Sequence, residues 1–388
     1  MTTKKKKKGP RARSIMVSFL VIALVLVLIF LYHRIHNSRE PVSPPFEEMH
    51  LSHSAFRSKI GDIESAIYES LYQGRVPESG IFFSAVEPRF EQGNHWDFTE
   101  ILIKVAEKNA LDQLNGHITR ALDNLKPGVT HQSEEVSPGE ILCHVFAQGF
   151  YTHRIKMSSN EGFQKRPSKL PRISIIIDDL GYDLEIVRRF LELDLQLSLS
   201  ILPLAPHTDA IVKEGHKKNF ELMLHLPMEP ENFPALNPGP GALFADMKDD
   251  EIRRIIESHL KRVTGARGVN NHMGSHFTQN RNKMTVVLGE LKKKNLFYID
   301  SRTTKETVAF ILAREMGVPT ANRNVFLDND LSPKALRFQM QRLMGMARTS
   351  GTAIGIGHPH EKTLELLKAY VPKIKSEFQV VRAADLAG

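Results

Sequence analysis

From residue 172 onward, short apolar runs alternate with longer segments in which apolar residues recur every three or four positions. Short runs are typical of buried strands, and the longer spacing is typical of amphipathic helices. One apolar stripe, for example, consists of Ile252, Ile255, Ile256 and Val263. We predict helices at residues 183–193, 208–217, 249–264, 280–294, 305–316, 333–347 and 361–375, a strand before each of them, and a last strand at 378–381.

Several of the apolar runs end in residues that bind protons or metals. These residues are Asp178, Asp179, His225, His272, Asp300 and His358. A carboxylate cannot remain unpaired inside an apolar core. The polar end of each strand must therefore lie at an edge of the sheet, where a cation or water can contact it. The repeated pattern predicts an active site.

Alternating strands and helices indicate an α/β domain with a parallel sheet, which is either doubly wound or closed into a barrel. In an open sheet the polar strand ends would lie along a crevice, whereas in a barrel they converge on one face. We therefore favour a distorted (β/α) barrel of seven or eight units for residues 172–388.

The segment at residues 51–157 has weaker and mixed signals. We predict helices at 60–71 and 109–125 and strands at 80–83, 98–105 and 141–151. These elements indicate a small α+β domain of unknown role. Its histidines are scattered without metal-ligand spacing, so we expect a packing module or a module that binds a protein partner. Residues 158–171, which contain Ser, Asn, Gly and Pro, are the predicted linker.

The formal net charge of +8 at pH 7 comes from the N-terminus. Nine of the 52 Lys and Arg residues precede the first acidic residue, Glu40, and the rest of the chain has 43 basic and 44 acidic residues. This local excess argues against a nucleic-acid partner. Instead, a basic tail at residues 1–14 precedes an uncharged apolar run at 15–32, which as a helix would be about 27 Å long and would span a bilayer.

The run at 15–32 is longer than the apolar core of a typical signal peptide, and His33 and Arg34 follow it in place of a small-residue cleavage site. We expect an uncleaved single-pass anchor, with a cleaved signal peptide as the alternative, and a spacer at 33–50. The positive-inside rule then predicts the inner (cytoplasmic) membrane, with the bulk of the chain in the periplasm. The single cysteine, Cys143, permits no intrachain disulfide and leaves the compartment open.

Asp178 and Asp179 have two chemical uses when they lie side by side. One carboxylate can bind a divalent metal while the other accepts a proton from water. The alternative is a helix cap, but one Asp suffices for a cap, and Asp183 lies nearer the next helix. The sequence therefore favours a functional pair.

The densest polar cluster in the chain is the segment from Asn270 to His276. His272 and His276 have HxxxH spacing, which can chelate one metal if the segment is helical. Gly274 between them favours a loop, so His272 is the stronger candidate ligand. His225 is a further candidate because it ends a strand beside the other polar strand ends.

The order of these motifs resembles the divergent polysaccharide deacetylases, distant relatives of the carbohydrate esterases that remove N- or O-acetyl groups from chitin-like and peptidoglycan sugars. The matching motifs are Asp178-Asp179, His225-Leu226-Pro227-Met228-Glu229-Pro230, Asn270-Asn271-His272-Met273-Gly274-Ser275, Asp300-Ser301 and Gly357-His358-Pro359. The resemblance covers about residues 172 to 386. It implies a distorted (β/α) barrel of about seven units, a divalent metal and an extracytoplasmic carbohydrate role.

The main deacetylase family carries its two metal histidines as HxxxH after the third strand, whereas here that place holds His225 and Glu229. By this resemblance, Asp179, His225 and His272 form the preferred metal triad, and zinc is the expected metal. The set of Asp179, His272 and His276 is the fallback.

The resemblance also implies roles around the metal. Asp178 is the expected base and His358 the expected acid, with Asp300 orienting the acid or binding substrate, and Asn271 is the expected oxyanion donor. The expected substrate-binding residues are Glu229, Asn271, Ser275, Asp300 and Ser301. Asp328 follows another predicted strand, and we expect it to contact the site residues and not the substrate.

The resulting hypothesis is a membrane-anchored, metal-dependent deacetylase whose partner is acetylated envelope polysaccharide. The alternative is a non-catalytic envelope protein that uses a deacetylase-like barrel to bind a glycan or a protein partner. Retention of both Asp178 and His358 beside the metal set favours the enzyme, because a pure binding protein needs no base.

Overall fold

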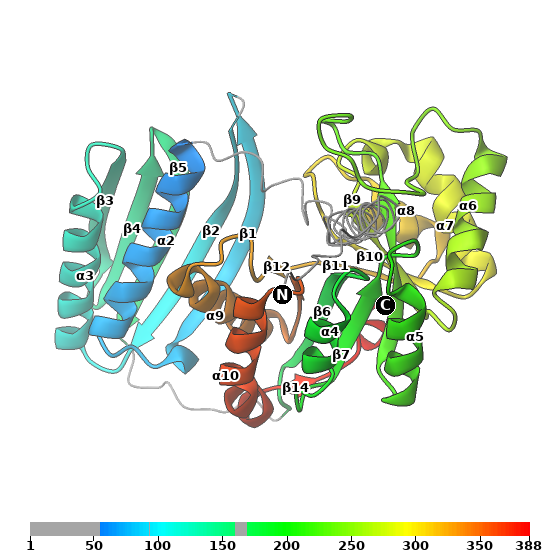
Figure 1. The fold of residues 1–388 in the computed structure, drawn as a ribbon. Coiled ribbons are helices and arrows are strands. Elements are labelled where there is room, and N and C mark those ends of the chain that lie inside the picture. Colours follow the sequence, from blue (N-terminus) through cyan, green and yellow to red (C-terminus); the bar gives the residue numbers. More distant parts are fainter. Residues whose placement is uncertain (1–54, 93, 160–168) are drawn as a thin grey trace, which may run out of the picture. The chain divides into compact units, whose positions relative to one another are not determined.

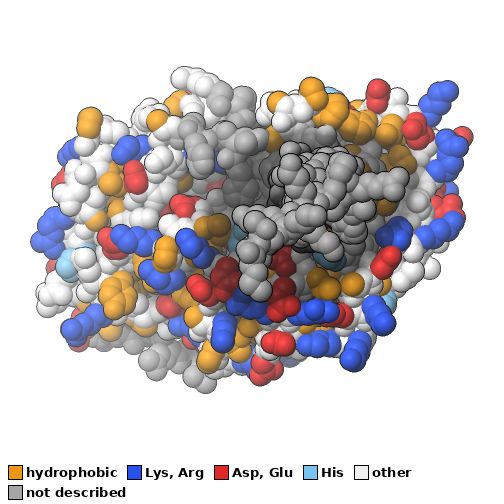
Figure 2. Space-filling model, in the orientation of Figure 1, with side chains coloured by type: hydrophobic (Ala, Val, Ile, Leu, Met, Phe, Trp, Pro, Cys, Tyr) orange, Lys and Arg blue, Asp and Glu red, His pale blue; other side chains and the backbone are white. Residues whose placement is uncertain are grey.

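The structure, a computed structural model, describes residues 55–92, 94–159 and 169–388 (Figure 1 and Figure 2). The predicted basic tail, membrane anchor and spacer lie outside the described residues, as does most of the predicted linker. None of the helices in the described part of the chain has the length and apolar character needed to cross a bilayer.

The N-terminal domain consists of a five-stranded sheet and two helices that pack on it (Figure 1). Its strands are β1 (Ile81–Glu91), β2 (Asn94–Val105), β3 (Val129–Ser137), β4 (Glu140–Ala147) and β5 (Phe150–Ser159), in the order β1-β2-β5-β4-β3. The β2–β5 pair is parallel and the other pairs are antiparallel. Helices α2 (Ala55–Gln73) and α3 (Lys108–Asp123) contribute Ile63, Ile67, Leu114 and Ile118 to the core of this domain.

Two features of this sheet differ from the sequence prediction. The predicted strand at 141–151 is two strands, because Gln148 and Gly149 have φ values of 50° and 88° and form a tight hairpin turn. Strand β3 escapes sequence-based prediction because, after the buried Val129, it is largely exposed and polar and lies at the edge of the sheet.

The C-terminal domain is built on a parallel sheet of nine strands within the described residues. Its strands are β6 (Arg172–Leu180), β7 (Leu197–Ile201), β8 (Glu221–Met228), β9 (Gly268–Met273), β10 (Phe297–Asp300), β11 (Thr320–Asn322), β12 (Val325–Phe326), β13 (Thr352–Gly357) and β14 (Gln379–Val380). The helices are α4 (Leu184–Phe190), α5 (Thr208–Lys217), α6 (Asp249–Arg262), α7 (Arg281–Lys293), α8 (Ala309–Met316), α9 (Pro333–Ser350) and α10 (Glu361–Glu377). Each predicted helix is present, although α8 begins at Ala309 and not at residue 305.

The parallel sheet curls into a half-barrel. Its strand order is β11-β10-β9-β8-β7-β6-β13-β12, and β14 pairs with β6. Only Arg323 and Asn324 separate the edge strands β11 and β12, and their N–H groups donate to Asp300 and Ile354 on other strands. No ladder joins the two edges in the described residues. The predicted parallel α/β architecture is therefore confirmed, and within the described residues the predicted distorted barrel takes the form of a curled half-barrel.

Strand residues alternate between the helix layer and the barrel interior. On β6, Ile175 and Ile177 belong to the core beneath the helices, whereas Ile176 belongs to a smaller interior core. The interior core includes Ala383 of the 3₁₀ helix η4 (Ala383–Asp385), which follows the strand paired with the start of β6. This interior core separates the polar cluster at the end of β6 from a second buried polar group, Ser198 and Glu221, which meets η4 near the start of β6.

His153 on β5 is a buried titratable group outside any predicted site. It is fully buried, its Nδ1 lies 3.0 Å from the Thr152 hydroxyl, and its Nε2 has no hydrogen-bond partner among the described residues. Burial, with a smaller contribution from the positive charge of Arg342, lowers the pKa of His153 to about 3. The unfolded chain, in which histidine titrates near pH ~6.5, therefore binds a proton that the folded chain does not.

We expect the free energy of unfolding to fall as the pH decreases from about 6.5 toward 3, because only the unfolded chain protonates His153. Between about pH 7.5 and pH 5 the loss is roughly 2 kcal/mol, at about 1.4 kcal/mol per pKa unit. Urea unfolding of His153→Gln at both pH values should show a loss smaller by that amount. The exposed His276 provides the control, since His276→Gln should keep the wild-type pH dependence. Equal pH dependence in all three proteins would contradict the prediction.

Candidate functional site

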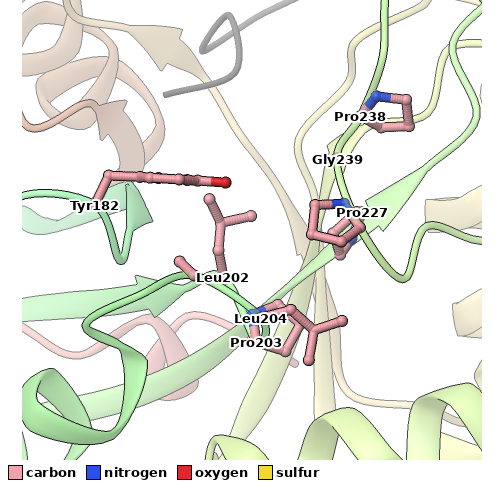
Figure 3. A pocket seen from close by; sticks show the side chains of 9 residues that line it. Tyr182, Leu202, Pro203, Leu204, Pro227, Pro238 and Gly239 are labelled. Atoms are coloured by element: carbon pink, nitrogen blue, oxygen red, sulfur yellow. The ribbon is translucent and has the colours of Figure 1, made fainter. Parts of the chain in front are cut away.

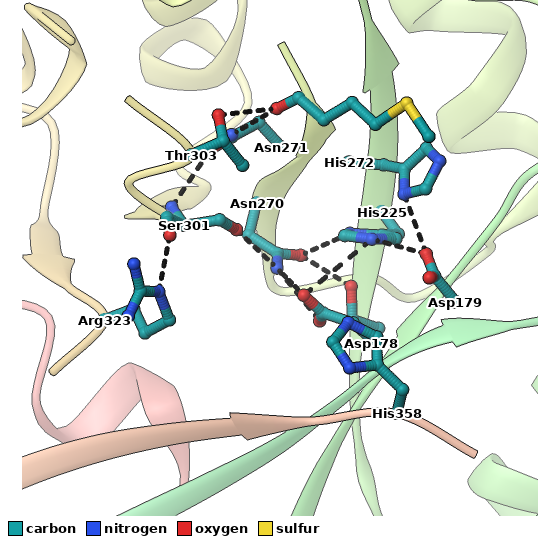
Figure 4. A network of polar contacts seen from close by, with 12 residues as sticks. Asp178, Asp179, His225, Asn270, Asn271, His272, Ser301, Thr303, Arg323 and His358 are labelled. Carbon is teal, nitrogen blue, oxygen red and sulfur yellow. Dashed lines mark hydrogen bonds and ion pairs between the residues drawn. The ribbon is translucent and has the colours of Figure 1, made fainter. Parts of the chain in front are cut away.

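Inward-facing residues at the carboxyl ends of several parallel strands form one buried cluster (Figure 4). The alternation that places Ile176 inside the half-barrel also places Asp178 inside, and His225 lies two positions beyond the interior residue Met223. The cluster contains Asp178, Asp179, His225, Asn270, His272 and His358, each with at most 2 % of its surface exposed. The predicted convergence of polar strand ends is therefore present.

Asp178 and Asp179 reach the same cluster although consecutive strand residues normally point to opposite faces. The pairing of β6 with β7 changes register between Ile177 and Leu180, and Asp179 has a φ of 56°. A bulge of this kind re-aims a side chain and costs backbone strain of about 1 kcal/mol. The local structure of β6 thus brings both carboxylates to one place.

Asp179, His225 and His272 form a set of three potential metal ligands. Oδ1 of Asp179 lies 2.9 Å from Nε2 of His225 and 2.8 Å from Nδ1 of His272. The three ligand atoms lie within 4.8 Å of one another. Burial would raise the pKa of Asp179, but the charge of His272 and hydrogen bonds from both imidazoles outweigh it and hold that pKa well below its usual range.

This donor set fits a divalent transition metal. Oδ2 of Asp179 and Nε2 of His272 are buried and have no hydrogen-bond partner among the described residues. Buried polar atoms without partners are costly, and a cation would satisfy them. One carboxylate with two imidazoles is a donor set that suits zinc. Of the two predicted triads, the structure brings together the preferred one.

His276 does not join this set. Met273 and Gly274 have φ values of 52° and 91°, so the chain turns after β9 and does not continue as a helix. HxxxH spacing chelates one metal only when both histidines lie on one helical face. His276 is exposed, and the fallback triad that includes it is not formed.

The second carboxylate, Asp178, lies beside the triad. Its Oδ2 is 3.8 Å from Nε2 of His225, and its two oxygens accept hydrogen bonds from Nδ2 of Asn270 at 3.0 and 2.9 Å. Burial raises the pKa of Asp178 above its usual value, against the lowering effects of His225 and His358. A carboxylate with a raised pKa is suited to accept a proton near neutral pH.

His358 is held by the buried carboxylate of Asp328. Nδ1 of His358 lies 2.8 Å from Oδ1 of Asp328, and the His358 backbone N–H donates to Oδ2 at 2.6 Å. The Thr363 hydroxyl donates to the same oxygen at 2.5 Å. Burial would raise the pKa of Asp328, but the charge of His358 and these hydrogen bonds lower it. The pair therefore fixes the imidazole in the way that an oriented general acid requires.

Comparison with known proteins assigns the C-terminal domain. The profile of the divergent polysaccharide deacetylase family matches residues 175–387. The chain belongs to this family. The uncharacterized protein YibQ of Escherichia coli K12 is 35% identical over 215 residues, which cover 55% of this chain and 67% of that protein. An uncharacterized protein of Haemophilus influenzae Rd is 32% identical over 215 residues, which cover 55% of this chain and 76% of that protein.

A solved structure shares the fold of this deacetylase-family domain. The crystal structure of an uncharacterized protein from Agrobacterium tumefaciens C58 has a TM-score of 0.54 and 20% identity, and it covers 57% of this chain and 92% of that one. The family match at residues 175–387 includes all residues of the buried cluster and leaves the N-terminal domain outside.

Two predicted substrate-binding residues of the deacetylase domain hold the loop that follows β8. A side-chain oxygen of Glu229 accepts a hydrogen bond from the Ala245 N–H at 2.7 Å. The Ser275 hydroxyl accepts one from the Glu231 N–H at 2.9 Å. These residues therefore fix the rim of the half-barrel close to the cluster.

Asp300 and Ser301 lie at the end of β10 and have different partners. Asp300 accepts hydrogen bonds from two backbone N–H groups and one hydroxyl in the segment 302–310. It fixes the turn before α8, whereas Asp328 takes the orienting position beside His358. The Ser301 hydroxyl lies 3.2 Å from Nδ2 of Asn270 and so belongs to the cluster.

Asn271 lies on the other face of β9. Strand alternation points Asn270 and His272 into the cluster and Asn271 toward the helices. Nδ2 of Asn271 donates to the Met273 carbonyl at 2.7 Å, and Oδ1 accepts from the Tyr298 hydroxyl at 2.9 Å. The predicted oxyanion donor therefore points away from the cluster. Asn270, for which the sequence predicted no separate role, takes the interior position. Its spacing of two from His272 on the same strand is the sequence signal that indicates this position.

Figure 3 shows a small pocket that is lined by uncharged residues. It is lined by Tyr182, Leu202, Pro203, Leu204, Ala205, Pro227, Pro238, Gly239 and Pro240. Pro227 lies two positions beyond His225 on the same face of β8 and pairs in register with His272. Tyr182 follows Asp179 by three positions. No lining side chain is charged, so the pocket suits an uncharged group.

Proposed function

We propose that this chain is a membrane-anchored, metal-dependent deacetylase that acts on acetylated envelope polysaccharide. The observation that carries the proposal is the arrangement of a buried Asp179–His225–His272 triad beside a further carboxylate, Asp178, and a carboxylate-held imidazole, His358. Membership of the deacetylase family supports the substrate class.

The triad would hold a divalent cation, with zinc as the proposed ion, and a bound cation of this kind polarises a carbonyl and lowers the pKa of water. Asp178 would accept the proton of the attacking water. His358 would donate a proton to the leaving amine or alkoxide, while Asp328 keeps its imidazole oriented. Water and the acetylated sugar would thus become acetate and the free amine or hydroxyl.

The apolar pocket provides a place for the neutral part of such a substrate. Tyr182 and Pro227 present apolar surface close to the triad, and no charged side chain lines the pocket. Apolar surface of this kind packs against a methyl group or against the C–H face of a sugar ring. Because the pocket has room for only about one water-sized group, we assign it to the acetyl methyl group and not to the sugar ring.

The second candidate is a non-catalytic protein that binds glycan in the same half-barrel. The position of Asn271 favours this glycan-binding candidate. Its side-chain amide, which was predicted to stabilise the oxyanion, instead forms hydrogen bonds with Met273 and Tyr298. The two candidates differ in turnover, because only an enzyme loses acetate release when Asp178 or His358 is replaced.

Removing any one member of the triad should strip the metal from the protein. We expect Asp179→Ala, His225→Ala and His272→Ala each to weaken Zn²⁺ binding by more than about 100-fold, since each removes one of three protein ligands. Elemental analysis and competition with a chelator measure this. His276→Ala and His360→Ala leave the triad intact and serve as controls with wild-type affinity. A chain that keeps its metal without His225 contradicts the assigned triad.

Removing the proposed base or acid should stop turnover and leave the metal bound. Asp178→Asn keeps the shape of the side chain without its basicity, and His358→Gln removes the acid. Acetate release from peptidoglycan and acetylated glycans should fall roughly 10²–10⁴-fold in each. The exposed Asp250 offers a control, as Asp250→Asn should match the wild type. No acetate release by the wild type, together with full complementation of a deletion strain by both variants, would favour the glycan-binding candidate.

The anchoring part of the proposal rests on the sequence at residues 1–32. A reporter that is active only outside the cytoplasm, fused after residue 45, should be active. Deletion of residues 4–8 should reduce correct orientation, because these lysines keep the N-terminus in the cytoplasm. A fusion that works only with a cytoplasmic reporter argues against the anchor, and release of a shortened soluble protein points to a cleaved signal.

A further inference from the structure

Asn270 is the residue that connects the metal triad to the second carboxylate (Figure 4). It is fully buried on the interior face of β9, and five hydrogen bonds converge on its side-chain amide. A buried polar group with this many partners fixes the groups around it.

The partners determine which way the amide points. Nδ2 donates to the two oxygens of Asp178 at 3.0 and 2.9 Å and to the Ser301 hydroxyl at 3.2 Å. Oδ1 accepts from the Ser200 hydroxyl at 2.5 Å and faces Nδ1 of His225 at 3.2 Å. If the amide were turned around, its oxygen would face the carboxylate oxygens of Asp178 and repel them. Only the observed orientation satisfies both ends.

This orientation sets the tautomer of His225. Because Oδ1 of Asn270 has no proton to give, Nδ1 of His225 carries the proton and donates it. The Nε2 atom lies 2.9 Å from Oδ1 of Asp179, inside the triad. With the metal absent it donates a second proton to that oxygen, and with a metal bound the same atom presents its lone pair to the cation. A histidine held in this way by its other nitrogen is oriented for metal binding.

We propose that Asn270 is a positioning residue that presents His225 to the metal and, through the other end of the same amide, holds Asp178 beside it. The inference rests on the proposed metal-dependent function, and it concerns a residue that is not itself a ligand. A purely structural role would change the stability of the fold without changing the metal affinity of the folded protein.

The test compares the Zn²⁺ affinity of the purified full-length chain with that of two variants, measured by competition with a chelator. Asn270→Ala removes the acceptor for His225, and its affinity should fall about 10–100-fold, as when other outer-shell partners of ligands are lost. Asn270→Asp keeps an acceptor oxygen for His225 and should restore the affinity to within about threefold of the wild type. It lacks the donor to Asp178, so acetate release should stay low while the metal remains bound.

Asn271→Ala is the matched control, because it removes the same group from the next residue of β9, on the opposite face. It should lower the thermal stability of the fold and leave the Zn²⁺ affinity of the folded protein unchanged. The absorption spectrum of bound Co²⁺ is a second readout. It should change in Asn270→Ala, which alters how His225 is held, and remain unchanged in Asn271→Ala.

Wild-type Zn²⁺ affinity in folded Asn270→Ala overturns this inference and leaves the proposed function standing. If Asn270→Ala does not fold, Asn270→Leu, which has about the same volume and no acceptor, takes its place: a 10–100-fold loss of affinity supports the inference, and wild-type affinity overturns it. A 10–100-fold loss of affinity in Asn270→Asp, which keeps the acceptor, also overturns it. A wild-type chain that binds no Zn²⁺ overturns the proposed function and this inference together.

Discussion

Two consecutive carboxylates lie in the interior of the half-barrel, and burying a carboxylate there is costly unless positive charge or hydrogen-bond donors surround it. Asp179 meets this requirement through two imidazoles within 3 Å, which hold its pKa low despite complete burial. Asp178 meets it through a neutral amide, and burial raises its pKa. The same chemical group, twice in a row in the chain, thus acquires two different proton affinities. This difference is what a site that separates metal binding from proton transfer needs.

The backbone of the parallel sheet makes this arrangement possible. Regular alternation sends one polar residue from each strand into the interior, and the bulge after Ile177 adds a second from β6. Hydrogen bonds then connect residues that are distant in sequence, as Asn270 does between β6 and β8 and as Asp328 does for His358 after β13. The apolar side chains of the interior core lie directly beneath these polar groups. Asp178 and His358, the two groups beside the triad, are therefore each held by a residue that is distant in sequence.

The rim of the half-barrel has a different physical character from its interior. The side chains of Glu229 and Ser275 accept hydrogen bonds from backbone N–H groups of the loop after β8. The side chain of Asp300 accepts one from a backbone N–H group before α8. Glu229 and Ser275 thereby hold the loop that supplies residues 238–240 to the small pocket beside Pro227, whereas Asp300 holds a segment that does not line it. Three residues predicted to bind substrate thus have backbone partners instead.

The sequence by itself determined the alternation of strands and helices in the C-terminal domain and which strands end in Asp or His. Both follow from local rules, because hydrophobic spacing and caps such as Ser332 before Pro333 act within a few residues. Only the tertiary structure decided which face of a strand each polar residue occupies and which distant residues it contacts. Strand β9 is buried on both faces, so its sequence carries no alternation to show that Asn270 faces inward and Asn271 outward. The role of Asp328, the exclusion of His276 and the open edge of the half-barrel likewise depend on where distant residues meet, which local spacing does not encode.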